Sequence, residues 1–206
     1  MNEIISYLDE LIPNPRCELN YTKDYELLLA TMLSAQTTDK RVNEVTAILF
    51  KKYNSLEKLR KANIQDIIPI IRPIGTFNKK ASNIIEIAKA LELVGDKVPN
   101  DRQFLETLPG VGRKTTNVVL SNIYHEQLIA VDTHVHRVSI RLGIAKKKDD
   151  VFVTEKKLNK FFKGQDLSRL HHQFVLFGRY HCKAQSPDCE NCKLKNICKY
   201  YQEKTK

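Results

Sequence analysis

Residues 108–115 decide the fold and read Leu-Pro-Gly-Val-Gly-Arg-Lys-Thr. Pro109 and Gly110 end one segment of helical periodicity, and a second helical segment follows over residues 115–124. Gly110 and Gly112 allow a tight reversal with positive φ, and they let another backbone approach the peptide amides closely. Free amides and the dipole at the start of the second helix favour an anion, so the stretch predicts a phosphate-binding turn between two helices. Taken by itself, the turn is also compatible with an ordinary helix–helix connection.

Helical periodicity continues outward from this turn in both directions. Apolar residues recur at three- and four-residue steps over residues 24–35, 81–94, 135–142 and 167–180. Pro99 and Asn100 mark the start of a further helix that leads into the turn. Residues 128–131 form a short apolar link that can be extended, but no segment shows the convincing alternation of a strand. We therefore predict an all-α fold of roughly ten helices joined by short loops.

The charge is unevenly distributed along the chain. Its 206 residues include 34 Lys and Arg against 24 Asp and Glu, and residues 101–206 carry +9 of the net charge of +10. This concentration favours a localised surface for a polyanion such as nucleic acid over a generally solvated basic surface. No apolar run approaches the ~18 residues that cross a bilayer, and the N-terminus lacks the pattern of a secretory signal. We expect a cytoplasmic monomer without membrane contacts.

Lys114 stands at the start of the helix that follows the turn. The positive end of the helix dipole and the neighbouring Arg113 both disfavour an ammonium ion there, so we expect this lysine to lose its proton readily. A neutral amine is a nucleophile, and it can form a Schiff base at an electrophilic carbon such as the anomeric carbon of a sugar. The commoner role of a lysine in this position is to contact a phosphate.

Residues 130–137 read Ala-Val-Asp-Thr-His-Val-His-Arg and place Asp132 where a helix begins. Aspartate is a favoured N-cap, and Asp132 would accept a hydrogen bond from the amide of His134 or Val135. A fixed carboxylate can also stabilise the oxocarbenium charge that develops when an N-glycosidic bond breaks. Lys114 and Asp132 are 18 residues apart with one helix between them, so both can face one pocket.

Four of the five cysteines fall within 17 residues near the C-terminus: Cys182, Cys189, Cys192 and Cys198. Thiols crowded in this way in a reducing compartment indicate a metal site rather than disulfides. Four cysteinyl ligands suit either tetrahedral zinc or a [4Fe–4S] cluster, and a single Cys-x2-Cys pair favours iron and sulfur modestly. His181 is a candidate substitute ligand, but its position beside Cys182 favours a bystander.

Taken together, these motifs resemble the endonuclease III family of helix-hairpin-helix DNA glycosylases, which have an associated abasic-site lyase activity. The resemblance covers nearly the full length of the chain. It rests on the turn, on the cysteine spacing and on five further stretches: Leu-Ser-Ala-Gln-Thr-Thr-Asp at 33–39, Ile-Gly at 74–75, Asn-Lys-Lys-Ala at 78–81, Val-Asp-Thr-His at 131–134, and His-His at 171–172 with Gly-Arg-Tyr at 178–180.

The resemblance implies a bifunctional enzyme of base excision repair that acts on double-stranded DNA with damaged pyrimidines or abasic sites. It implies that Lys114 is the Schiff-base nucleophile, and that Asp132 assists it and stabilises the developing sugar charge. The damaged base leaves, and β-elimination then cleaves the strand 3′ to the abasic site. The resemblance also implies that the cofactor is a [4Fe–4S] cluster held by Cys182, Cys189, Cys192 and Cys198.

The same resemblance implies a six-helix barrel domain over residues 18–126, an iron–sulfur cluster domain over residues 1–17 and 127–206, and a cleft between them. Gln36 would fill the space that the extruded nucleotide leaves in the duplex. The turn would grip phosphate without reading sequence. We expect the DNA contacts to come from Gln36, Thr76, Gly110, Gly112, Arg113, Thr115 and His134.

Three positions depart from the family pattern. Thr76 occupies a position where relatives often place a leucine wedge, so we expect either weaker intercalation from this side chain or participation of Phe77 or Ile74. The loop between the first two cysteines of the cluster offers Lys183 as its basic residue, and we expect Lys193 and Lys195 to supplement it. His136 replaces an apolar or aromatic residue, and the sequence gives no reason for it.

Two other interpretations of the same motifs remain. The adenine-specific mismatch glycosylases of this superfamily resemble the chain in the turn and the cluster, but they usually lack a lysine at the position of Lys114. A non-catalytic DNA-binding protein with a redox-sensing cluster would use Lys114 only to contact phosphate. Covalent trapping of the protein on DNA distinguishes both interpretations from a Schiff-base mechanism.

Overall fold

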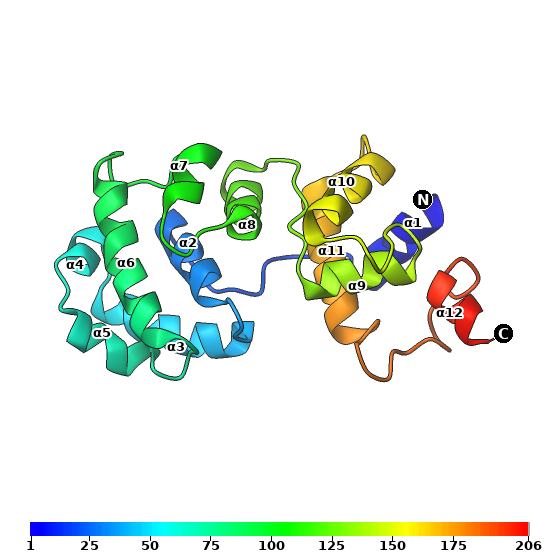
Figure 1. Ribbon diagram of the computed structural model, residues 1–206, viewed down its shortest axis with the longest axis horizontal. Coiled ribbons are helices and arrows are strands. Elements are labelled where there is room, and N and C mark those ends of the chain that lie inside the picture. Colours follow the sequence, from blue (N-terminus) through cyan, green and yellow to red (C-terminus); the bar gives the residue numbers. More distant parts are fainter. Residues whose placement is uncertain (206) are drawn as a thin grey trace. The chain divides into compact units, whose positions relative to one another are not determined.

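The computed structural model describes residues 1–205, which consist of helices and the turns and loops that join them (Figure 1). No strand occurs in this part of the chain, so the prediction of an all-α fold is confirmed. The chain divides into two compact units: Cys17–Tyr124, and Met1–Arg16 together with the residues from His125 onward. Within residues 1–205, no helix combines the length and the apolar character needed to span a membrane.

The unit Cys17–Tyr124 contains seven helices: α2 (Asp24–Leu33), α3 (Asp39–Lys52), α4 (Leu56–Arg60), α5 (Ile64–Ile71), α6 (Phe77–Glu92), α7 (Arg102–Thr107) and α8 (Arg113–Tyr124). Helix α2 is the centre of this unit, since every one of its residues after Asp24 is buried. It packs against α3, α6 and α8, while α6 also packs against α4 and α5. Its sequence DYELLLATML is mostly apolar, which suits a helix buried on all sides, and the carboxylate of the buried Glu26 accepts hydrogen bonds from the amides of Thr22 and Lys23.

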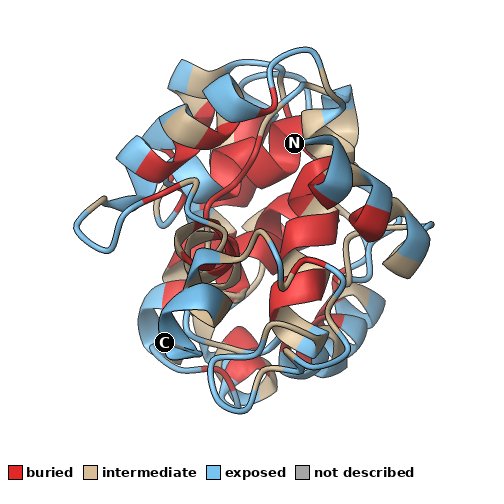
Figure 2. Cartoon of the chain, turned by 90° about the vertical axis from the view of Figure 1, so that its right-hand side faces the viewer, coloured by how far each residue is buried: buried red, intermediate tan, exposed pale blue. Residues whose placement is uncertain are grey.

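The other unit contains five helices: α1 (Asn2–Leu11), α9 (Thr133–Arg141), α10 (Val151–Phe161), α11 (Leu167–Tyr180) and α12 (Lys199–Lys204). Helix α11 packs against α1 and α9. The buried residues of these helices and of α10 form the core of this unit, and Figure 2 draws buried residues in red. Aromatic rings dominate this core: Tyr7 of α1 meets Phe177 edge-to-face at 6.2 Å between centroids, and Phe162 meets Phe174 at 5.6 Å.

Glycine brings α9 and α11 close together. A Cβ atom at Gly178 would lie 2.9 Å from the Cβ of His134 and 3.2 Å from its carbonyl oxygen. The two helices therefore approach at a distance that no larger residue at this position of α11 would allow. This contact fixes α9, and with it Asp132 at its start, against the rest of the unit.

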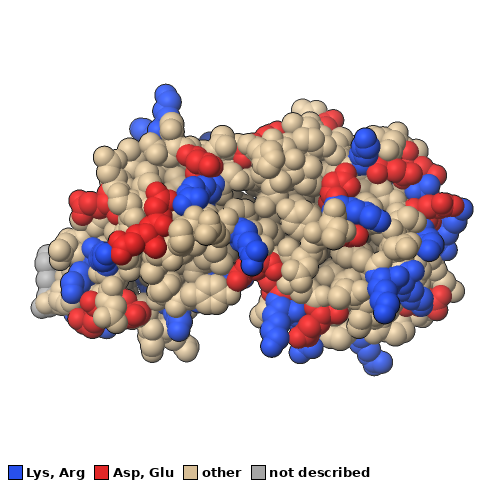
Figure 3. Space-filling model, turned by 180° about the vertical axis from the view of Figure 1, so that it is seen from behind, with Lys and Arg blue, Asp and Glu red and all other residues tan. Residues whose placement is uncertain are grey.

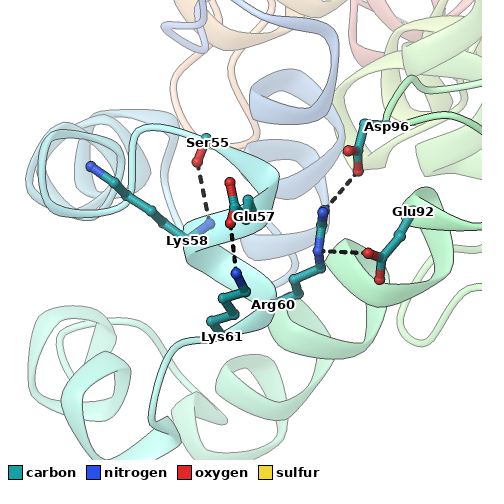
Figure 4. Close-up of polar contacts among 7 residues, drawn as sticks. All are labelled: Ser55, Glu57, Lys58, Arg60, Lys61, Glu92 and Asp96. Atoms are coloured by element: carbon teal, nitrogen blue, oxygen red, sulfur yellow. Dashed lines mark hydrogen bonds and ion pairs between the residues drawn. The ribbon is translucent and has the colours of Figure 1, made fainter.

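A small polar network attaches α4 to the end of α6 (Figure 4). Ser55 caps α4 by accepting a hydrogen bond from the amide of Lys58 at 3.2 Å. Arg60 then reaches Glu92 at 3.2 Å and Asp96 at 2.8 Å. Both carboxylates are about half exposed, so these pairs contribute little to stability and mainly orient α4.

The structure corrects several helix boundaries. Residues 1–205 form twelve helices where the pattern predicted roughly ten, and α10 and α12 are the unexpected ones. Helix α7 begins at Arg102 rather than after Pro99, because the side chain of Asp101 accepts a hydrogen bond from the amide of Phe104 at 3.0 Å and caps the helix there. Helix α6 begins at Phe77 rather than Ala81. Helix α8 begins two residues earlier than expected, which places Lys114 within its first turn.

Candidate functional site

The turn between α7 and α8 is a hairpin seated on the core of its unit. It closes through a hydrogen bond from the amide of Val111 to the carbonyl of Leu108 at 3.1 Å. Gly110 has φ +77°, and a Cβ atom there would lie 2.6 Å from Nδ2 of Asn83 and 3.2 Å from Cγ of Met32. Glycine is therefore required at this position for its backbone conformation and for its close approach to α6 and α2.

Gly112 differs from Gly110, which corrects the expectation that both glycines have positive φ. Within residues 1–205, the glycines with positive φ are Gly95, Gly110, Gly143 and Gly164. A Cβ atom at Gly112 would meet no atom within 4 Å, so the space beside it is open. Its carbonyl accepts the first hydrogen bond of α8, from the amide of Thr116 at 2.9 Å. Gly112 thus leaves room for another molecule's backbone rather than for the protein's own packing.

The three residues after this glycine differ in exposure. Arg113 and Lys114 are exposed, whereas Thr115 is only 8% exposed and belongs to the packed face of α8. Lys114 is therefore an exposed lysine two residues after Gly112, whose side-chain position is open. The first amides of a helix lack partners within the helix, so an anion near this turn would meet hydrogen-bond donors as well as positive charge.

Gln36 and Thr76 occupy the tips of two exposed turns of the same unit. Gln36 follows α2 with φ 57°, and Thr76 precedes α6 with φ 56°. A left-handed conformation is uncommon for residues with a Cβ atom, and it persists where the surrounding structure imposes it. Sequence reasoning identified both residues but gave no sign of this conformation. Lys80 entered the sequence analysis only as part of the stretch 78–81 and with no role of its own; in the structure it is buried, and its Nζ donates to the carbonyls of Leu33 and Ala35.

Asp132 begins α9 in the other unit, as the sequence predicted. Its Oδ1 accepts a hydrogen bond from the amide of Val135 at 2.8 Å, and the side chain remains half-buried. One carboxylate oxygen thus serves as the cap. Lys114 and Asp132 belong to different units of the structure.

His134 and His136, two residues apart on α9, both make contacts within their own unit. His134 Nδ1 lies 3.2 Å from Nη2 of Arg137. The Nε of the same arginine donates to the carbonyl of Cys182 at 3.1 Å. His136 Nε2 lies 3.0 Å from the carbonyl of Asp149. The second contact explains the histidine that the sequence left unexplained, because it ties α9 to the loop before α10.

The four C-terminal cysteines surround one cavity of about 150 Å³. All four are free thiols and half-buried. Apolar side chains complete the lining, among them Tyr7, Phe177 and Leu194. Burial raises the pKa of Cys192, and the negative charges of the other three cysteines raise it further. Among residues 1–205, no three His, Cys, Asp or Glu side chains are grouped so as to hold a metal ion.

Arg141 organises the first part of the cysteine loop. This buried residue donates from Nη1 to the carbonyls of Cys182 and Lys183 at 3.1 and 2.6 Å, and from Nη2 to that of Ala184 at 3.1 Å. Nη1 also lies 3.2 Å from the sulfur of Cys182. A buried guanidinium needs such partners, and here they hold the loop beside the cavity.

The basic residues expected to supplement this loop already have protein partners. Lys193 pairs with Glu10 of α1, with one Nζ–Oε distance of 2.7 Å, and Lys195 donates to the carbonyl of Glu190 at 3.2 Å. Lys183 is exposed. More broadly, Figure 3 shows basic and acidic side chains intermingled on the face that it draws, rather than one continuous basic surface.

Comparison with known proteins identifies the family. Residues 29–164 match the HhH-GPD superfamily of base excision DNA repair proteins. Endonuclease III of Bacillus subtilis is 45% identical over 200 residues, covering 97% of this chain and 91% of that protein. Endonuclease III of Escherichia coli is 41% identical over 202 residues, covering 98% and 95%.

Solved structures of the same family have the same fold. A trapped endonuclease III–DNA covalent intermediate matches with a TM-score of 0.92 at 42% identity, over 100% of this chain and 98% of that chain. A non-covalent endonuclease III–DNA complex matches with a TM-score of 0.94 at 41% identity, over 99% and 96%. The sequence and structural matches both span nearly the whole chain, and the chain therefore belongs to the HhH-GPD superfamily and, within it, to the endonuclease III family.

Proposed function

We propose that this protein is a DNA glycosylase and abasic-site lyase of base excision repair, which removes damaged pyrimidines from duplex DNA through a Schiff base on Lys114. The observation that carries the proposal is the exposure of Lys114 in the first turn of α8, two residues after the open position of Gly112. A trapped covalent DNA intermediate of a relative that is 42% identical over the full chain supports it.

The reaction begins with electrostatic capture of the duplex. The net charge of +10 attracts the phosphate backbone without regard to sequence, so binding weakens steeply as salt increases. The hairpin then holds a phosphate near the first amides of α8, where Gly112 leaves room for the strand and Arg113 adds charge. A damaged pyrimidine that is weakly stacked and paired leaves the helix at a lower cost than an intact base. Gln36 and Thr76 enter the duplex at the vacated position.

Chemistry then proceeds at the sugar. The neutral amine of Lys114 bonds to the anomeric carbon while the glycosidic bond breaks, and the base leaves with the bonding electrons and takes up a proton. The carboxylate of Asp132 stabilises the positive charge that develops on the sugar. The bond from the anomeric carbon to the ring oxygen then breaks, the oxygen takes up a proton as the nitrogen loses one, and the sugar opens to an imine. This imine acidifies the neighbouring carbon, whose proton is lost as the 3′-phosphate departs. Water hydrolyses the imine and returns Lys114 to its free form.

Two domains divide this work. Residues 18–126 carry the hairpin, Lys114, Gln36 and Thr76, while residues 1–17 and 127–206 carry Asp132 and the cysteines. Cys182, Cys189, Cys192 and Cys198 hold a [4Fe–4S] cluster, and their placement as four free thiols around one largely apolar cavity supports this assignment. The cluster, when bound, supplies a cross-link that orders the C-terminal loop. The enzyme acts as a monomer on cytoplasmic DNA.

Covalent trapping tests the proposal. A duplex with one abasic site, incubated with the protein and borohydride, is expected to give a protein–DNA adduct with the wild type and none with Lys114→Gln. Arg113→Gln is the matched control, because it removes one positive charge from the adjacent exposed position and leaves the amine in place. We expect this control to trap DNA more slowly but to completion.

The contrary outcomes are distinct. An adduct that persists in Lys114→Gln would assign the nucleophile to another amine. Wild-type protein that binds DNA yet forms no adduct would refute the lyase mechanism and leave a monofunctional glycosylase or a non-catalytic binding protein.

Metal analysis tests the cofactor. The purified protein is expected to contain iron and acid-labile sulfide and to absorb visible light broadly. Stoichiometric zinc without visible absorbance would contradict the cluster assignment and indicate a tetrahedral zinc site instead.

A further inference from the structure

Lys80 is a buried lysine that holds the end of α2 in place. It is 5% exposed, although the neighbouring residue on the same helix, Lys79, is exposed. Its Nζ donates hydrogen bonds to the carbonyls of Leu33 at 2.9 Å and Ala35 at 2.8 Å. Leu33 is the last residue of α2 and Ala35 directly precedes Gln36, so the side chain of Lys80 holds the backbone from which Gln36 projects.

The backbone of Lys80 is tied to the other exposed turn. Its amide donates to the carbonyl of Thr76 at 3.1 Å, which is the first hydrogen bond of α6. One residue thus contacts both turns, Thr76 through its amide and the turn of Gln36 through its side chain. Both turn residues adopt a left-handed backbone, with φ 57° at Gln36 and 56° at Thr76, which needs support from surrounding structure.

The same face of α6 also meets the hairpin. Asn83, three residues after Lys80, contacts the position of Gly110 so closely that an added Cβ would lie 2.6 Å from its Nδ2. Residues 76, 80 and 83 follow helical spacing, and therefore lie along one side of α6. This side of the helix contacts three separate segments of the chain: the Gln36 turn, the Thr76 turn and the hairpin.

Capping alone does not require a lysine here. The final carbonyls of a helix are commonly satisfied by a glycine-containing turn or by water, at no cost of burying a charge. Burial lowers the pKa of Lys80, because removal from water disfavours the ammonium ion. The dipole at the C-terminal end of a helix favours a cation, and two carbonyls at the end of α2 accept hydrogen bonds from Nζ. The arrangement therefore favours rigidity of this turn.

We propose that Lys80 is a positioning residue for base flipping, which holds the Gln36 and Thr76 turns in fixed register so that both enter the duplex as one rigid unit. This inference rests on the proposed function, since it assigns a role within the same reaction. Lys80 itself touches neither the damaged base nor the sugar. Its loss would leave the chemistry at Lys114 intact and would impair the opening of the duplex.

Two DNA substrates separate these effects. A single-stranded oligonucleotide with an abasic site needs no flipping and reports β-elimination alone. A duplex with one dihydrouracil, whose saturated ring stacks poorly, requires the turns to enter the helix. For Lys80→Met we expect an unchanged rate on the single strand and an excision rate about 10²-fold lower on the duplex, as for a misplacement of about 1 Å. Lys79→Met is the matched control, since it removes the same charge from the exposed neighbour.

Fluorescence reports the flipping step directly. A fluorescent purine analogue opposite the lesion brightens when the turns displace its stacked neighbour, so Lys80→Met is expected to abolish the change and Lys79→Met to preserve it. An equal loss of rate on both substrates, or a wild-type fluorescence change in Lys80→Met, would overturn the proposal. If Lys80→Met does not fold, Lys80→Arg replaces it. A loss of rate confined to the duplex substrate then supports the proposal, and a wild-type ratio of the duplex rate to the single-strand rate overturns it. Wild-type protein inactive on both substrates would refute the proposed function itself.

Discussion

Replacing Gly110 by alanine is expected to destabilise the protein strongly, for two reasons: the backbone conformation of this residue and the space around it. The residue has φ +77°, and a left-handed backbone costs a residue with a Cβ atom about 1–2 kcal/mol. The added Cβ would also lie 2.6 Å from Nδ2 of Asn83 and 3.2 Å from Cγ of Met32, both of which are buried. Overpacking of this kind costs about 1–3 kcal/mol, so the free energy of unfolding should fall by about 2–5 kcal/mol.

Gly112→Ala is the matched control, two residues away in the same hairpin. Its Cβ meets no atom within 4 Å and its φ is not positive, so unfolding in urea should change by no more than about 0.5 kcal/mol. Its methyl group fills the open space beside the helix, so we expect weaker binding to duplex DNA at constant salt. Gly110→Ala is thus a stability variant, and Gly112→Ala a binding variant. Equal losses of stability in the two variants, or full DNA affinity in Gly112→Ala, would refute this division.

Three further outcomes are expected. Asp132→Asn should keep the N-cap of α9 and lose excision activity, whereas Asp132→Ala should also lose about 1 kcal/mol of stability in urea; full activity in the asparagine variant would leave capping as the only role. Hydrogen bonds from Gln173 and Arg169 lower the pKa of Asp9, so its stabilising effect is complete above about pH 4 and is lost as pH falls through the lower folded value. Asp9→Asn should therefore reduce the loss of thermal stability in acid, and an unchanged acid profile would contradict this. Gly178→Ala should lower the melting temperature by forcing α11 away from α9, and an unaltered melting temperature would show that the helices can separate without cost.

Local signals account for the features that the sequence predicted correctly. Asp132 stands at the start of its helix as expected, because an N-cap bonds to an amide only three residues ahead, here that of Val135 at 2.8 Å. The hairpin was also predicted from its own residues. By contrast, α10 begins at Val151 directly after a run of charged residues that is typical of a loop, and exposed apolar residues at its start obscure the helical pattern.

Features that depend on distant contacts were not predictable from the sequence. Lys80 reaches carbonyls 45 and 47 residues earlier in the chain, and nothing in its local pattern distinguishes it from the exposed Lys79. His136 bonds to a loop 13 residues later. The open space at Gly112 and the crowding at Gly110 depend on which elements pack behind each residue. The sequence therefore indicated which residues carry the chemistry, whereas the distant contacts that hold those residues in place are seen only in the folded chain.

The most direct test of the central claim is to identify the residue that carries DNA after borohydride trapping. The adduct with an abasic-site duplex would be digested with nuclease and protease, and the modified peptide located by mass spectrometry. The account predicts a deoxyribose remnant on Lys114, in the first turn of α8. A remnant on the N-terminal amine, on Lys80 or on any other lysine would contradict it.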